Sequence, residues 1–157
     1  MKFESSKEFS YDIDVAWQAL KKAKDLGVEP GSSIEVISEN TWKAHAHGLM
    51  GKETSCTMYE AEFDEKSKTV IITGRRNTKK EADVIVIKLS KIEDDKVRLH
   101  FSMQIGMGKS VLGKTIGKLM GGHMHEIVEK SIFDNFEEMC RQQNIEVKDE
   151  KDCKFEG

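Results

Sequence analysis

The sequence predicts an α+β domain in which short antiparallel strands precede one long C-terminal helix. Between residues 34 and 107, runs rich in β-branched and aromatic residues alternate with turn-forming clusters, which is typical of an antiparallel meander. After Gly108 the apolar residues recur at helical spacing as far as about Gln143. The chain has 157 residues, enough for one domain with a substantial core.

The first two elements are expected within residues 2–26. Residues 2–10 alternate in polarity, with Phe3 and Phe9 on one face, as in a strand. Asp12 can then cap a helix over residues 13–26, because its apolar residues recur at helical spacing. A glycine and proline cluster ends this helix.

Six further strands are expected, and their polar turns separate them clearly. The expected ranges are 34–37, 41–48, 53–63, 69–76, 82–92 and 97–107. The turn at residues 48–51 predicts a hairpin in which His47 faces Lys52, His45 faces Thr54 and Lys43 faces Cys56. This register puts the following residues on one face: Trp42, Ala44, Tyr59, Ala61 and Phe63. It puts His45, His47, Cys56 and Met58 on the other face.

The end of the chain is predicted to differ from the rest. Residues 1–143 are expected to form the single domain. Residues 144–157 are charged and have little to bury, so we expect a tail that is frayed or disordered.

Three glycines form a regular pattern in the predicted long helix. Gly113, Gly117 and Gly121 recur every fourth residue and therefore lie on one strip of its surface. Each interior glycine costs about 1 kcal/mol relative to alanine, which suggests a steric need. Three explanations of the strip are open. The glycines could allow the helix to pack closely against the sheet or to bend, or they could leave room for a ligand. The third explanation is that they belong to a basic amphipathic segment that lies on an anionic membrane. Contact with a membrane is the explanation that the pattern favours least, since an ordinary packed helix looks the same.

The segment from Gly108 to Thr115 reads GKSVLGKT and matches the phosphate-binding pattern G-x-x-x-x-G-K-[ST]. In nucleotide hydrolases this loop joins a buried parallel strand to a helix. The run before it alternates polar and apolar residues, as in a sheet with one solvated face. Only one helix and a tail follow it. We therefore expect no nucleotide to bind here.

Charge and cysteine content narrow the classes of partner. The 25 basic and 28 acidic residues give a formal net charge of −3, so no overall positive field favours nucleic acid. The N-terminus lacks the apolar core of a secretory signal and no stretch approaches the length of a membrane span, so we expect a cytoplasmic protein. Cys56, Cys140 and Cys153 show no C-x-x-C spacing and are expected to be free thiols.

Candidate catalytic and metal-binding residues are few. His45, His47 and Cys56 share a face of the expected hairpin, but their spacing fits no familiar zinc set and a solvated face explains them. His123 and His125 lie two apart on a helix and point in different directions. We expect no metal site and no cofactor. No nucleophile elbow, metalloprotease or paired-carboxylate motif occurs, so the sequence indicates no catalytic residue and favours a protein that is not an enzyme.

The order of elements resembles the helix-grip fold of the START/Bet v 1-like (SRPBCC) superfamily. The segment DIDVAWQAL at residues 12–20 resembles the opening helix of that fold, and VIVIKLSKIEDDKVRLHFSMQI at residues 84–105 resembles its last hairpin. The segment that begins GKSVLGKTIGKLMGG at residue 108 resembles its terminal helix. The resemblance covers most of residues 2–143 and is nearest to small bacterial members. It implies a curved antiparallel sheet wrapped around the long helix.

Proteins that resemble this sequence commonly hold an apolar or amphipathic small molecule between sheet and helix. The resemblance therefore implies such a ligand here, and a lining from the inner face of the sheet and the facing side of the helix. The candidate lining residues are Trp42, Tyr59, Phe63, Ile85, Ile87, Leu89, Leu99, Phe101, Met103, Ile116, Gly117, Met120, Gly121, Met124 and Ile127. The same residues could form a solid core, so an open and a filled interior both fit the sequence.

Two other functions are found on the same fold. One is an enzyme of the polyketide cyclase or hydratase type, with His123, Tyr59 or Glu126 as acid or base. The other is a module that binds a protein partner without a ligand, similar to chaperone-activating or ribosome-associated relatives. A monomer or a weak dimer is expected.

Overall fold

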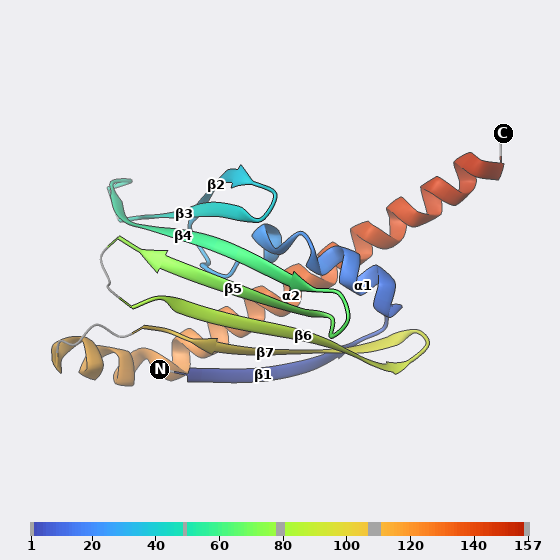
Figure 1. Cartoon of the computed structure of the whole chain (residues 1–157). Coiled ribbons are helices and arrows are strands. Elements are labelled where there is room, and N and C mark those ends of the chain that lie inside the picture. Colours follow the sequence, from blue (N-terminus) through green and yellow to red (C-terminus); the bar gives the residue numbers. More distant parts are fainter. Residues whose placement is uncertain (1, 49, 78–80, 107–110, 156–157) are drawn as a thin grey trace.

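The computed structural model shows a seven-stranded antiparallel sheet packed against a long C-terminal helix (Figure 1). The structure describes residues 2–48, 50–77, 81–106 and 111–155, and within the last range it describes side chains for residues 125–147. The strands are β1 (Lys2–Phe9), β2 (Ser33–Ser38), β3 (Thr41–His47), β4 (Glu53–Asp64), β5 (Thr69–Arg76), β6 (Asp83–Glu93) and β7 (Lys96–Gln104). The helices are α1 (Ile13–Leu20), the short 3-10 helix η1 (Ala23–Leu26) and α2 (Val111–Phe155).

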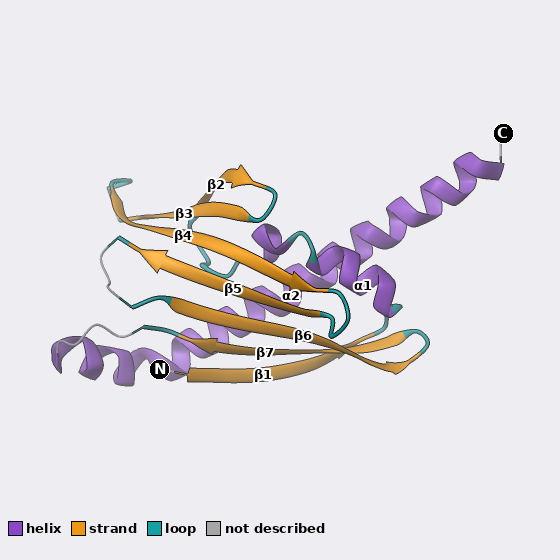
Figure 2. Cartoon of the chain, in the orientation of Figure 1, coloured by secondary structure: helices purple, strands orange, loops and turns teal. Residues whose placement is uncertain are grey.

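The strands follow one another across the sheet, except that the first strand joins the last. The order is β1-β7-β6-β5-β4-β3-β2, and every neighbouring pair is antiparallel. Both helices lie against the same face of this sheet (Figure 2). The predicted α+β class, with a curved sheet around a long helix and a short helix after the first strand, is therefore confirmed.

The core fills the space between the sheet and the middle of α2. Strand β7 shows the pattern, because Leu99 and Phe101 are fully buried while His100 between them is exposed. The Phe101 ring meets Phe133 of α2 edge to face, with ring centroids 5.6 Å apart. Phe9 of β1 meets Phe136 in the same way at 5.1 Å. Each of these rings contributes about 1.5–3 kcal/mol by burial, so α2 is firmly held between about Val128 and Cys140.

The first helix is shorter than expected. Asp12 caps α1 as predicted, and its carboxylate accepts a hydrogen bond of 2.8 Å from the Asp14 N–H. The helix predicted over residues 13–26 is wrong beyond Leu20, because Lys22 adopts a non-helical conformation and η1 follows as a separate turn. Gly27 ends η1 with a φ of +68°, a conformation that glycine adopts without strain.

The end of η1 is attached to α2 at Gly27. Ser131 donates a hydrogen bond of 3.0 Å to the Gly27 carbonyl, and the Asn135 amide donates one of 3.1 Å to the Leu26 carbonyl. A β-carbon on Gly27 would lie 2.4 Å from Asn135 Nδ2 and 2.8 Å from Ser131 Oγ. The glycine is therefore required both by its backbone angle and by this close approach.

The predicted register of the β3–β4 hairpin is wrong by two residues. Lys43 pairs with Met58 and His45 with Cys56, where Cys56 and Thr54 were expected. The loop closes between Gly48 and Lys52, whose backbone groups form a 2.8 Å hydrogen bond, and a bulge follows in β4. Because an even shift preserves the alternation of side chains, the predicted faces are correct: Trp42 and Tyr59 are buried on one side.

Helix α2 continues to Phe155, past its expected end near Gln143. Residues 144–155, for which a frayed or disordered tail is expected, are therefore helical, and this end of α2 extends beyond the sheet (Figure 1). An ion pair of 3.7 Å joins Glu146 on this segment to Lys22. The domain boundary at residue 143 stays a prediction. No helix in the described ranges combines the length and the apolar character needed to cross a membrane.

The GKSVLGKT segment begins outside the described residues, which resume at Val111 with α2. The strand that precedes it, β7, pairs antiparallel with β1 on one side and β6 on the other. A phosphate-binding loop instead follows a strand of a parallel sheet. The expected absence of nucleotide binding stays a prediction, and the surroundings of the Gly113, Gly117 and Gly121 strip lie outside the described side chains.

Candidate functional site

A cavity of about 240 Å³ lies between the inner face of the sheet and α2. Strands β4 to β7 form its floor, α2 covers it, and the loop after η1 closes one side. The lining residues are Val28, Glu29, Pro30, Tyr59, Arg76, Asp83, Ile85, Met103, Ile105, Ile127 and Val128. Apolar side chains and a small cluster of polar side chains thus line one partly open cavity.

The apolar part of the lining comes from three directions. Ile85 and Met103 are directly opposite each other on β6 and β7, and both are buried. Ile127 and Val128 cover them from α2, where Val128 is buried and Ile127 is 45% exposed. Ile127 therefore lies at the opening of the cavity, where a ligand would cover it.

The polar part of the lining is centred on Arg76 at the end of β5. Arg76 Nη2 lies 3.9 Å from Glu29 Oε1 and 3.7 Å from Asp83 Oδ2. Its Nε donates a hydrogen bond of 3.2 Å to the hydroxyl of buried Thr57. The Gly106 N–H in turn donates a 2.8 Å hydrogen bond to Asp83 Oδ1. The contacts of Arg76 to the two carboxylates are longer than direct hydrogen bonds, so they are ion pairs of ordinary length.

Tyr59 connects the polar and apolar parts of the cavity. Its hydroxyl donates a 2.9 Å hydrogen bond to Glu29 Oε2. Burial, and then the neighbouring Glu29 carboxylate, raise the pKa of Tyr59 far above its ordinary value of 10. The phenol is therefore neutral at any physiological pH and acts as a hydrogen-bond donor.

The ring of Tyr59 is fixed from both neighbouring strands. Trp42 of β3 stacks on it with ring centroids 5.5 Å apart and an interplanar angle of 23°. On the other side Gly74 of β5 is its direct pairing partner, and a β-carbon there would lie 2.5 Å from Tyr59 Cε1. The missing side chain at Gly74 thus provides the space that the tyrosine ring occupies.

The structure brings together only some of the predicted lining residues. Tyr59, Ile85, Met103 and Ile127 line the cavity. Those buried in the core beside it are Trp42, Ile87, Leu89, Leu99 and Phe101, while Phe63 is partly buried and packs on Trp17. Those in the part of α2 whose side chains are not described are Ile116, Gly117, Met120, Gly121 and Met124. In the part of the chain whose side chains are described, the remaining predicted lining residues therefore pack in the core beside the cavity.

Sequence reasoning missed the charged residues of the cavity. Arg76 follows Val70 and Ile72 at a spacing of two, so the alternation of β5 places it on the inner face. Asp83 precedes Ile85 in the same way on β6. These two residues could have been found from the strand pattern. Glu29 lies in a loop, and nothing local indicates that it reaches Tyr59.

The acid–base residues considered from sequence are separated in the structure. Tyr59 is in the cavity, whereas Glu126 is exposed and borders a groove beside β1 with Lys7 and Lys130. His123 lies outside the described side chains. On the opposite face of the sheet, His45 lies beside Glu53 and Cys56, whereas His47 hydrogen-bonds to Ser33.

A long helix held against a curved antiparallel sheet, with a cavity between them, defines the helix-grip class of protein. The chain has the fold of the START/Bet v 1-like (SRPBCC) superfamily, as the sequence predicts. No family model and no curated protein sequence matches it.

Solved structures show the same fold at low sequence identity. The Zhui aromatase/cyclase from Streptomyces sp. R1128 superposes with a TM-score of 0.66 at 11% identity, covering 91% of this chain and 94% of that one. A START superfamily protein from Mycobacterium smegmatis gives 0.61 at 9%, covering 90% and 97%. Ara h 8.0201, a Bet v 1 homologue, gives 0.56 at 15%, covering 90% and 98%.

Proposed function

We propose that the protein binds a small amphipathic molecule in the cavity between the sheet and α2. The carrying observation is the lining itself, in which an apolar wall from β6, β7 and α2 meets a polar group around Arg76. Specific small-molecule sites commonly have this composition, mostly apolar with a few converging polar groups. The apolar body of the ligand would lie against Ile85 and Met103, and its polar group near Glu29 and Arg76.

The volume and charge of the cavity restrict the ligand. About 240 Å³ is slightly below the usual range of ligand pockets, roughly 300–1,000 Å³, so the molecule is small. Among the lining residues that the structure describes, one cation, Arg76, stands against two carboxylates, Glu29 and Asp83, in a lining of low polarity. A hydroxyl or amino group is therefore favoured as the polar end, and a carboxylate is disfavoured because it would add a third negative charge.

The structural comparisons support the same class of function. A START superfamily protein and an aromatase/cyclase share this fold. This likeness is consistent with a domain that binds a small molecule. Ile127 belongs to the same lining and is 45% exposed, so part of its apolar surface is available to a ligand.

Native mass spectrometry combined with a blocked cavity tests the proposal. We expect the purified protein to carry a small adduct that denaturation releases, and to bind neutral or cationic amphipathic fluorescent probes. The variant Ile127→Trp should reduce probe affinity at least about 10-fold, because the indole would fill the opening. The matched control Ile37→Trp, an equally exposed isoleucine on β2, should bind normally.

Two results would contradict this function. One is a purified protein that shows its polypeptide mass alone and binds none of the probes. The other is probe affinity that falls equally in both tryptophan variants, since the probe would then bind elsewhere on the surface.

A second candidate function is acid–base chemistry on a carbonyl substrate, of the polyketide cyclase or hydratase type. The observation that favours it is the neutral Tyr59 hydroxyl inside the cavity, which now donates its proton to Glu29 and could turn to donate it to a carbonyl oxygen instead. Turnover of a model polyketone or enoyl thioester, followed by absorbance and abolished by Tyr59→Phe, would support this function. Tight binding of such compounds without turnover would favour the binding function.

A further inference from the structure

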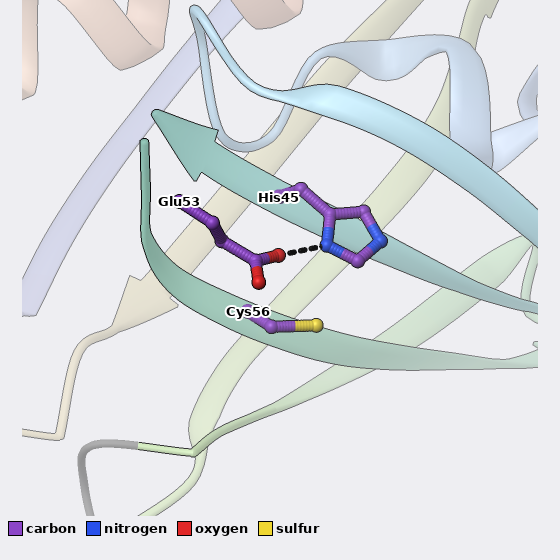
Figure 3. Close-up of side chains that lie close together, drawn as sticks. All are labelled: His45, Glu53 and Cys56. Atoms are coloured by element: carbon purple, nitrogen blue, oxygen red, sulfur yellow. Dashed lines mark hydrogen bonds and ion pairs between the residues drawn. The ribbon is translucent and has the colours of Figure 1, made fainter. Parts of the chain in front are cut away.

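Three potential metal ligands meet on the outer face of the β3–β4 hairpin, away from the cavity. One ring nitrogen of His45, one carboxylate oxygen of Glu53 and the sulfur of Cys56 all lie within 4.8 Å of one another. The Glu53 carboxylate already forms a short hydrogen bond with His45 Nδ1 (Figure 3). All three side chains converge on one small volume between the two strands.

The register of the hairpin brings this set together. His45 and Cys56 are direct pairing partners, so their β-carbons are about 4.5–5.5 Å apart on one face. Glu53 would point to the other face in a regular ladder. The bulge between the pairs Ala46–Ser55 and His47–Glu53 leaves one extra residue in β4 and moves Glu53 to the face of Cys56. The bulge thus adds a carboxylate to a histidine–thiol pair.

The donor types fit zinc better than other common cations. Imidazole, carboxylate and thiolate are the three ligand types of protein zinc sites, whereas magnesium and calcium prefer oxygen ligands alone. Tetrahedral bonds of 2.0–2.3 Å place ligand atoms about 3.3–3.8 Å apart. Atoms up to 4.8 Å apart need to approach by at most about 1–1.5 Å to meet this geometry, whereas His45 Nδ1 and the Glu53 carboxylate, now in direct contact, need to move slightly apart.

The surroundings of the three ligands support a built site. The other ring nitrogen of His45, Nε2, lies 3.8 Å from a carboxylate oxygen of Glu35, which needs to move less than 1 Å closer to accept a hydrogen bond as the outer carboxylate of a metal-bound histidine does. The backbone of Cys56 is fixed by Asn77, whose side chain accepts from its N–H at 3.1 Å and whose N–H donates to its carbonyl at 3.1 Å. His45 and Cys56 are half-buried and Glu53 is exposed, which leaves one side open.

We propose that His45, Glu53 and Cys56 form a zinc-binding site whose fourth position is open to solvent. Binding releases protons, because the thiol must ionise and the ring nitrogen that takes the metal must be unprotonated. Affinity therefore decreases as the pH is lowered. The site is on the face of the sheet opposite the cavity and shares none of its lining residues.

Cobalt substitution tests the site directly on the full-length protein. Reduced protein titrated with Co²⁺ should develop a thiolate-to-cobalt charge-transfer band at one equivalent, and Zn²⁺ should abolish it. Cys56→Ser should remove the band, and it should weaken zinc binding, measured against a chromophoric chelator, at least about 100-fold. Glu35→Gln should weaken binding about 10-fold, as expected for an outer carboxylate.

Two control variants make the result unambiguous. His47→Gln should bind zinc normally, because His47 contacts Ser33 and is not part of the set. Cys153→Ser should keep the charge-transfer band. The proposal is overturned if no thiolate band forms, if the band persists in Cys56→Ser or disappears in Cys153→Ser, or if Cys56→Ser binds zinc as tightly as the parent. Circular dichroism confirms that each variant is folded.

Discussion

Replacing Tyr59 by phenylalanine tests the polar group of the cavity with the smallest possible change. The ring, its stacking on Trp42 and its fit against Gly74 are all retained. The substitution removes the hydroxyl that donates to Glu29 Oε2 at 2.9 Å. Any loss of stability therefore reports this hydrogen bond and the unpaired carboxylate that it leaves.

The expected loss follows from the contacts of Glu29. A hydrogen bond to a charged group contributes about 1.5–3 kcal/mol. Glu29 keeps Arg76 at 3.9 Å, and its side chain is 16% exposed, so water can partly replace the lost donor. We expect Tyr59→Phe to lower the free energy of unfolding by about 2 kcal/mol at pH 7.

The same substitution should show a diagnostic dependence on pH. Folding raises the pKa of Tyr59 above its unfolded value near 10, through burial and then Glu29. The stability that this shift provides is fully present below pH 10 and is lost as the pH rises further, by about 1.4 kcal/mol per unit. Phenylalanine has no proton to lose. The difference between the two proteins should therefore shrink from about 2 kcal/mol at pH 7 to about 0.5 kcal/mol at pH 11.

Urea unfolding at both pH values measures this difference. The effect of lysine ionisation on the free energy of unfolding cancels in the comparison, because both proteins contain the same lysines. The chain has only two tyrosines, so in a Tyr11→Phe background the tyrosinate absorbance reports Tyr59 alone. A stability difference independent of pH, or tyrosinate forming near pH 10 in the folded protein, would refute the reasoning.

Two further predictions concern the packing of α2. Gly27→Ala should lower the free energy of unfolding, measured by calorimetry, by about 2–4 kcal/mol, because it combines backbone strain with a clash against α2. The control Gly31→Ala should lower it by only about 1–2 kcal/mol, because Gly31 has a φ of +82° but open space around it. Equal losses in the two variants would show that the clash is relieved. Burial raises the pKa of Cys140 to about 12, so about one molecule in 10⁴ has a Cys140 thiolate at pH 8. Peptide mapping after brief alkylation should therefore find Cys56 modified and Cys140 intact. Rapid labelling of Cys140 would contradict its burial.

The fold could be predicted from sequence because its signals are local. Alternation with a period of two identifies each strand, and the change to helical spacing after residue 108 identifies α2. The break at Lys22 was missed, since residues 13–26 keep a helical pattern on both sides of it. The helical end of α2 was missed because a charged segment with little to bury gives no packing signal.

The sites were harder to predict because they depend on register and on chain path. The two-residue error in the predicted register of the β3–β4 hairpin kept every side chain on the correct face but did not pair His45 with Cys56. The bulge that turns Glu53 to the outer face has no sequence signature. Arg76 and Asp83 follow from strand alternation, whereas the approach of Glu29 to Tyr59 depends on how a loop crosses the sheet edge. Local periodicity does not contain this information.

The pairing of the first strand with the last has a consequence for biosynthesis. Phe9 pairs with Val97, so β1 leaves the ribosome about 90 residues before its partner. At roughly 5–20 residues per second this strand waits about 5–20 s with its phenylalanines unprotected. The six-stranded remainder can form hairpin by hairpin, but β1 and α2 can add only after synthesis is nearly complete. In the nascent chain, β1 therefore remains without its pairing partner until β7 has been synthesised.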